Sequence, residues 1–165
     1  MMKYAVDVHK GPIAIRYPRG EAYCGLKEQR APIQLGRAEE IKDGSKVMLL
    51  AFGSMVKKAE EVDQLLQAHG IDAGICNARF AKPFDKEYLE AIKDRYDLIV
   101  TMEENVYTGG FGQQVQAYLN DIDYKGKVLK IAIPDEFVQH GSVTLLFKEL
   151  GMDAESITER ILEVL

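Results

Sequence analysis

Arg16 and Arg19 are the residues of this sequence that are best suited to binding an anion. They lie around the tetrapeptide YPRG at residues 17–20, which follows an apolar run predicted as a strand over residues 13–17. A guanidinium group can bind a phosphate through two parallel hydrogen bonds. The proline fixes its own φ angle and the glycine permits a tight turn, so together they define how the chain leaves the strand. The pattern therefore fits a phosphate site, and it also fits solvated arginines in a turn.

Glu103 and Glu104 form a pair of carboxylates directly after the apolar run at residues 97–102. Two carboxylates can perform acid–base chemistry when the pKa of one of them is raised. Neighbouring residues of an extended chain point to opposite sides, however, so a shared catalytic site is disfavoured. Contact of one carboxylate with a partner subunit is the alternative. His140 lies between a predicted strand and a helix that Ser142 can cap, so it is a candidate for ligand binding or for loop packing.

Three glycines, Gly109, Gly110 and Gly112, open a helix predicted over residues 110–122. The free N–H groups of a helix start can hold a phosphate. The spacing differs from the dinucleotide-binding pattern GxGxxG, so we expect close backbone packing here instead. Arg79 follows another predicted strand, and we expect it to form a salt bridge between domains or between subunits.

The remaining histidines and the cysteines give no sign of a metal site or a disulfide framework. His9, His69 and His140 do not share metal-ligand spacing, and His69 falls at a predicted helix end, where the helix dipole favours it. Cys24 and Cys76 are far apart in sequence and lack the CxxC pattern. We therefore expect a reducing, cytoplasmic location.

The composition is that of a soluble globular chain with one main domain. It has 165 residues, 47% of them hydrophobic and 28% charged, with a net charge of -5. A negative chain lacks the basic face that nucleic-acid binding requires. No apolar run approaches the ~18 residues of a membrane-spanning helix, and the N-terminus does not resemble a secretory signal. We expect neither a nucleic-acid partner nor a membrane.

Short apolar runs alternate with amphipathic helical segments along most of the chain. This alternation predicts a three-layer α/β/α fold of the α/β class, with a mostly parallel sheet of about five strands. Residues 33–41 are the candidate for an antiparallel strand. The other strands are predicted at residues 46–52, 71–78, 97–102 and 127–133, and the helices at 54–68, 85–95, 110–122, 143–150 and 154–165.

The first part of the chain does not fit this alternation. Residues 1–10 are predicted as the tail of a helix, residues 13–17 as a strand, and residues 20–30 as a linker. A lone helix and strand cannot bury their own apolar face. We therefore expect residues 1–30 to be the tail of a truncated domain plus a linker, and residues 31–165 to be a complete domain.

Several of these segments together resemble one family, the 1-deoxy-D-xylulose-5-phosphate synthases. The matching segments occur in the family's order and cover nearly the whole chain. They are GPIAIRYPRG at residues 11–20, LAFGSM at 50–55, NARFAKPFD at 77–85, EENV at 103–106, GGFG at 109–112, IPDEF at 133–137, HGS at 140–142 and LGMD at 150–153. The Gly-Asp-Gly…Asn signature for thiamine diphosphate and magnesium is absent from the sequence.

The resemblance implies a thiamine-diphosphate- and Mg²⁺-dependent transferase that condenses pyruvate with glyceraldehyde 3-phosphate and supplies isoprenoid and thiamine biosynthesis. It implies a homodimer whose N-terminal and pyrimidine-binding domains are missing here, with residues 1–30 as the tail of the latter and residues 31–165 as a transketolase-type C-terminal domain. This chain alone is then expected to be inactive and to bind neither cofactor, while serving domain packing, dimerisation and acceptor-phosphate contact. The family's phosphate-binding arginine falls on Arg19. The alternatives are a stand-alone interaction or ligand-binding module and the C-terminal domain of another thiamine enzyme.

Overall fold

The structure is a computed structural model, and it describes residues 1–17, 23–28 and 31–165. Its elements follow the predicted alternation closely from residue 39 onward. In chain order they are α1 (Met2–Asp7), β1 (Glu39–Lys42), β2 (Val47–Ala51), α2 (Met55–Ala68), β3 (Ala73–Asn77), α3 (Lys86–Ile92), β4 (Leu98–Val106), α4 (Phe111–Asp121), β5 (Lys127–Ile133), α5 (Val143–Glu149) and α6 (Ala154–Val164).

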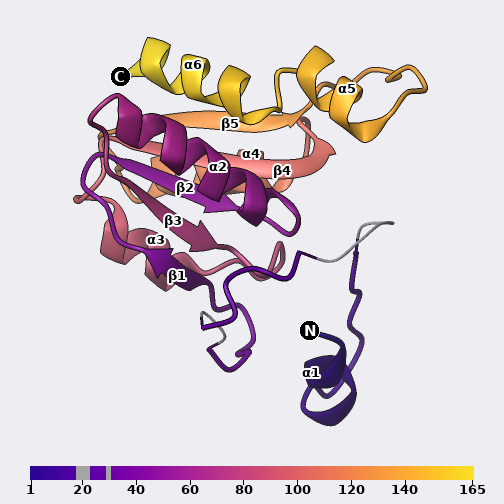
Figure 1. Cartoon of the computed structure of the whole chain (residues 1–165). Coiled ribbons are helices and arrows are strands. Elements are labelled where there is room, and N and C mark those ends of the chain that lie inside the picture. Colours follow the sequence, from indigo (N-terminus) through magenta and orange to yellow (C-terminus); the bar gives the residue numbers. More distant parts are fainter. Residues whose placement is uncertain (18–22, 29–30) are drawn as a thin grey trace.

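The five strands form one sheet in the order β1-β3-β2-β4-β5. Strands β3, β2, β4 and β5 are parallel, and only β1 runs antiparallel, against β3. This confirms the predicted mostly parallel sheet. Because parallel strands end at the same edge, the loops after β2, β3, β4 and β5 gather along one carboxyl edge of the sheet (Figure 1).

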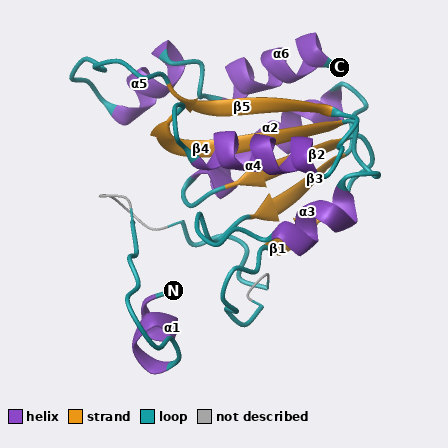
Figure 2. Cartoon of the chain, turned by 180° about the vertical axis from the view of Figure 1, so that it is seen from behind, coloured by secondary structure: helices purple, strands orange, loops and turns teal. Residues whose placement is uncertain are grey.

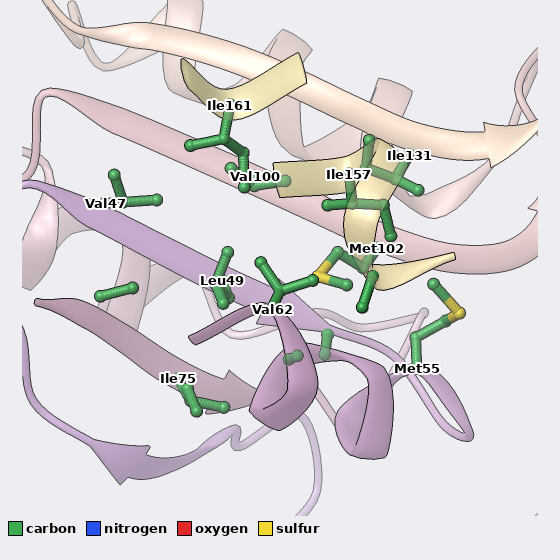
Figure 3. Close-up of a cluster of buried hydrophobic side chains, with 14 of the residues drawn as sticks. Val47, Leu49, Met55, Val62, Ile75, Val100, Met102, Ile131, Ile157 and Ile161 are labelled. Carbon is green, nitrogen blue, oxygen red and sulfur yellow. The ribbon is translucent and has the colours of Figure 1, made fainter. Parts of the chain in front are cut away.

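Helices α2 and α6 cover one face of the sheet, and α3 and α4 cover the other, which gives the three predicted layers (Figures 1 and 2). The first core lies between the sheet and the pair α2 and α6. In Figure 3, side chains from the sheet meet Val62 of α2 and Ile157 and Ile161 of α6. All three of these helix residues are fully buried, and burying each such side chain contributes about 1.5–3 kcal/mol.

The second core lies under α3 and α4 and uses the opposite side chains of the same strands. Met48 and Leu50 of β2 point into it, while Leu49 points into the first core. Leu89 of α3 and Val115 of α4 pack onto these strand side chains and complete the second core. Strands buried on both faces must be apolar at successive positions, which is why β2 and β4 begin as continuous apolar runs.

Residues 1–17 form an arm that leaves the body of the domain (Figures 1 and 2). Its helix, α1, confirms the predicted helix, but the strand predicted at residues 13–17 is wrong, because this segment is irregular and mostly exposed. A strand needs a neighbour for its N–H and C=O groups, and no described strand lies beside it. The strand predicted over residues 33–41 is also shorter in the structure, since β1 begins only at Glu39.

Helix α5 and the loop before it follow β5, which is the outermost strand at one side of the sheet. No residue of α5 is buried, and Phe137, Val143 and Leu145 are strongly exposed. None of the helices in the described ranges is both long and apolar enough to cross a bilayer.

Candidate functional site at the carboxyl edge of the sheet

Arg79 lies just beyond β3 and holds the chain segment that leads into the domain. Its backbone has a φ of +57°, a left-handed conformation that a non-glycine residue adopts only under local constraint. The Asn77 side chain accepts a hydrogen bond from the Arg79 N–H at 3.1 Å. The guanidinium forms an ion pair with Glu39 of β1 and donates to the carbonyl of Ala31 at 3.0 Å.

This arrangement corrects the expectation that Arg79 bridges two domains or two subunits. Glu39 belongs to residues 31–165, so the ion pair lies within one predicted domain. The Arg79 and Glu39 side chains are only 7% and 9% exposed, and Glu39 also accepts from the Ala31 N–H at 2.6 Å. A buried charge is costly unless an opposite charge lies beside it, so each of these two side chains requires the other. Arg79 is therefore a structural residue that joins β1 and β3 to the preceding segment.

Glu103, near the end of β4, closes the N-terminus of α4. Its side chain is buried, and its carboxylate accepts hydrogen bonds from two N–H groups of the first turn of that helix, from Phe111 at 2.9 Å and from Gly112 at 2.7 Å. The positive end of the helix dipole favours a carboxylate at this position. Glu103 thus satisfies N–H groups that would otherwise lack an intrahelical acceptor.

The glycines after β4 are required by this close approach of α4 to the strand. A Cβ atom on Gly110 would lie 2.4 Å from the Val106 carbonyl oxygen and 2.7 Å from the Glu103 carboxylate. A Cβ atom on Gly112 would lie 2.3 Å from the Thr101 hydroxyl. Close backbone packing, the expected role, is therefore confirmed for Gly110 and Gly112.

The N-terminus of α4 is consequently not a phosphate site, because Glu103 already accepts from the N–H groups that a phosphate would need. A diphosphate placed there would also meet a buried carboxylate. No group of three His, Cys, Asp or Glu side chains in the described ranges could hold a metal ion. The N-terminus of α4 therefore does not fit the diphosphate of thiamine diphosphate, and the described side chains do not fit Mg²⁺.

Glu103 and Glu104 lie in different environments, and the Glu103 carboxylate is occupied by the start of α4, which disfavours a shared catalytic site. Glu103 is buried and Glu104 is only partly so. It is the main-chain carbonyl of Glu104 that makes a long-range contact: it accepts a hydrogen bond from the Arg16 guanidinium at 3.0 Å. Arg16 thereby connects the arm to the end of β4, a role that sequence reasoning did not assign to it.

Arg19, the predicted phosphate-binding residue, lies outside the described residues, as do the proline and glycine of its motif. Tyr17, the first residue of the YPRG motif, is described and is 72% exposed. Tyr17 is thus the one described residue of the motif, and it directly follows Arg16, which contacts the carboxyl edge.

The histidines occupy separate parts of the molecule. His140 is exposed in the loop between β5 and α5, so it does not pack inside that loop. Ser142 caps α5, as expected, by accepting from the Leu145 N–H. His69 is at the end of α2, and His9 is in the arm, within 3.3 Å of the Pro12 carbonyl oxygen.

Cys76 is buried on the α3 face of the sheet, near the partly buried Tyr88, and neither cysteine forms a disulfide in the structure. Burial raises the pKa of the Cys76 thiol to about 12, so the thiol stays protonated at neutral pH. Burial likewise raises the pKa of Tyr88, whose hydroxyl donates to Glu40 at 2.8 Å. A protonated, buried thiol is a packing group and no nucleophile.

The comparisons with known proteins agree with this fold. The C-terminal domain of transketolase matches residues 36–157. A 1-deoxy-D-xylulose-5-phosphate synthase of Lachnoclostridium phytofermentans is 46% identical over 98% of this chain and 26% of its own length. One of Chlorobaculum tepidum is 43% identical over 93% of the chain and 24% of its length.

Among solved structures, a protein described as "Split gene transketolase, inactive beta4 tetramer" matches with a TM-score of 0.75 and 28% identity. The match covers 81% of this chain and 44% of that one. The chain spans about a quarter of the length of the curated relatives, and it corresponds to their C-terminal portion. The chain therefore belongs to the transketolase C-terminal domain family, in the form found at the C-terminus of 1-deoxy-D-xylulose-5-phosphate synthases.

Proposed function

We propose that this chain is the C-terminal part of a synthase that condenses pyruvate with glyceraldehyde 3-phosphate to 1-deoxy-D-xylulose 5-phosphate. The observation that carries the proposal is the 46% identity with such a synthase over 98% of the chain. Residues 1–30 then belong to the pyrimidine-binding domain and the linker, and residues 31–165 form the C-terminal domain. The enzyme is a cytoplasmic homodimer, and its missing N-terminal and pyrimidine-binding domains pack against this chain.

In the complete enzyme, thiamine diphosphate with Mg²⁺ supplies the carbanion chemistry. The residues of this chain contribute binding and positioning, because the edge of the sheet offers no fit for the cofactor. The chain alone is inactive and binds neither cofactor. Its substrate contact is Arg19, which binds the phosphate of the acceptor and so orients the aldehyde for attack.

A stand-alone ligand-binding module is the less favoured function. Such a module would need Glu103, His140 and the glycine loop to surround a shared pocket. Glu103 is instead buried against α4, and His140 is exposed beyond the end of β5. Their separate environments leave the synthase proposal with the better support.

The experiment is an Arg19→Ala substitution, measured after mixing this chain with the N-terminal three quarters of the Lachnoclostridium phytofermentans synthase. Loss of a charged hydrogen-bonded pair with the phosphate should remove about 2–4 kcal/mol of transition-state stabilisation, which lowers kcat/KM for glyceraldehyde 3-phosphate about 30- to 900-fold. The KM for pyruvate should change little. Arg95→Ala is the control, because Arg95 contacts Asp43, away from the carboxyl edge and the arm. Acceptor kinetics that stay unchanged in Arg19→Ala would refute the assigned role.

A further inference from the structure

We propose that two cationic side chains, Arg160 and Lys130, protect the β5 edge of the sheet from pairing with the β5 strand of a second copy of this chain. Strand β5 is the last strand of the described sheet, and Figure 1 shows it at the border beside α6. An edge strand presents unpaired N–H and C=O groups, to which an edge strand of another molecule can bind. The proposal concerns the body of the domain and does not depend on the proposed function.

The contacts of β5 on its inner side show which of its residues face outward. The Lys127 N–H donates to the Asp97 carbonyl at 2.8 Å, and the Ile133 carbonyl accepts from the Tyr107 N–H at 2.7 Å. Alternate residues from Lys127 to Ile133 therefore direct their main-chain groups to β4, and the residues between them direct theirs to the open side. The outward-facing residues are Val128, Lys130 and Ala132.

The sequence of β5, KVLKIAI, is otherwise well suited to pairing with another strand. Apart from its two lysines, every residue is aliphatic, and the strand contains neither proline nor glycine. Short segments with high β propensity and few charges are the ones that pair between molecules. An open edge of this composition therefore requires protection, and lysines on the edge are one means that proteins use.

Arg160 of α6 covers the middle of this edge from one face of the sheet. Its guanidinium donates to the Lys130 carbonyl at 3.2 Å, which is the central outward-facing acceptor of β5. A partner strand would need this carbonyl, so it would have to displace a charged donor from it. Helix α6 itself is held in place by the first core, and the Lys127 ammonium group binds the Val164 carbonyl at its C-terminal end.

The Lys130 side chain covers the same point from the opposite face. Its ammonium group binds the Gln116 side chain of α4 and lies 4.7 Å from the centroid of the Tyr107 ring. Antiparallel pairing of all the outward-facing residues with those of a second copy places the two Lys130 side chains directly opposite each other, on a two-fold axis. Like charges at such a position destabilise the pairing.

The two side chains thus act from both faces on the middle of one edge. The main-chain acceptor is held by Arg160, and the position across from Lys130 is closed to a second lysine. The β5 edge can therefore stay open without joining two copies into one continuous sheet. Any contact between copies of this chain should leave this edge free.

Amide hydrogen exchange of the full chain, followed by NMR at a low and at a high protein concentration, tests the proposal. In the native chain, the outward-facing N–H groups of Val128 and Ala132 should exchange quickly at both concentrations. In the double variant Arg160→Ala/Lys130→Thr, pairing should cover these groups. Their exchange should slow about tenfold or more at the high concentration, and sedimentation should show dimers or larger species.

Two further variants serve as controls. Arg95→Ala/Lys93→Thr removes the same two charges from the chain just after α3, away from β5, and should leave the exchange of Val128 and Ala132 unchanged. Ala132→Pro, added to the Arg160→Ala/Lys130→Thr variant, removes an outward-facing N–H without removing a bond to β4. It should restore fast exchange at Val128 and abolish the larger species.

Three results would overturn the proposal. The first is exchange at Val128 and Ala132 that already slows with concentration in the native chain. The second is exchange that stays fast at both concentrations in Arg160→Ala/Lys130→Thr, whether or not this variant associates through another surface. The third is equal slowing in the charge-matched control. Protection of the Leu129 N–H, which faces β4, shows that a variant is folded, and Arg160→Ala alone replaces the double variant if that protection is lost.

Discussion

The N-terminal arm differs from the body of the domain, α5 and the loop before it excepted, in where charged and apolar side chains lie. The body buries charges and satisfies them: Glu103 binds the start of α4, and Arg79 pairs with Glu39. The arm exposes apolar side chains, with Val6 83% and Tyr17 72% exposed. Exposed apolar groups that gather on one segment indicate a surface that is covered by another partner.

The difference shows where stability and function lie in this chain. The body has two hydrophobic cores, one on each face of the sheet. The arm carries the start of the YPRG motif but touches the body at few points, notably through Arg16 and Tyr4. In the proposed enzyme, the apolar side of the arm is covered by the rest of the pyrimidine-binding domain. Substitutions in the two regions should therefore have different effects.

The largest expected effect on stability is that of Glu103→Ala. The substitution leaves two buried N–H groups of α4 without acceptors, and each such group costs about 1–3 kcal/mol. We expect the free energy of unfolding of the chain to fall by about 4 kcal/mol, as measured by urea denaturation. Glu104→Ala is the matched control and should change it by less than about 0.5 kcal/mol. Equal losses in the two variants would contradict the assigned role of Glu103.

A smaller effect is expected from Asp153→Ala at the N-terminus of α6. The Asp153 carboxylate accepts from the Ser156 N–H at 3.1 Å and from its hydroxyl at 2.7 Å. Loss of such a cap costs about 1 kcal/mol at neutral pH. This tests the body alone, because α6 covers the first core and does not touch the arm.

The contribution of Asp153 should also depend on pH. Burial raises the pKa of this carboxyl, but its hydrogen bonds, those from Ser156 first among them, together outweigh burial and hold the pKa below its ordinary value. A lowered pKa in the folded state stabilises the fold above the unfolded pKa of about 3.9, and the gain disappears as the pH falls through the folded value. The difference between the native chain and Asp153→Ala should therefore narrow below about pH 4. A constant difference from pH 7 to pH 2 would contradict this explanation.

The smallest effect on stability is expected in the arm, from Val6→Ser. Val6 is 83% exposed, so the free energy of unfolding should change by less than about 0.5 kcal/mol. Binding of the chain to the N-terminal part of the synthase should nevertheless weaken, because the exposed valine is proposed to be buried there. Titration calorimetry measures this binding. Unchanged affinity would show that this face of α1 is not covered in the enzyme.

The body of the fold could be predicted from sequence because its signals are local. Strands such as β2 are continuous apolar runs, and Ser142 and Gly110 mark helix starts by their chemistry. The strand predicted at residues 13–17 was wrong because an apolar run forms a strand only beside a partner, and the described part of this chain offers none.

The contacts of the site were harder to predict. The pairing of Arg79 with Glu39 crosses 40 positions and the contact of Arg16 with Glu104 crosses 88, and no local pattern marks either of them. The role of Glu103 did have a signal: a carboxylate just upstream of a glycine-rich helix start can bind that start itself. A bound phosphate was the competing interpretation, and the choice between them required the geometry.

The proposed function is tested most directly by the formation of 1-deoxy-D-xylulose 5-phosphate from pyruvate and glyceraldehyde 3-phosphate, with thiamine diphosphate and Mg²⁺ present. The chain is assayed alone and then mixed with the N-terminal three quarters of the Lachnoclostridium phytofermentans synthase. We expect no turnover by either part alone and turnover by the mixture. Turnover by this chain alone, or no turnover by a mixture in which the two parts bind each other, would contradict the proposed function.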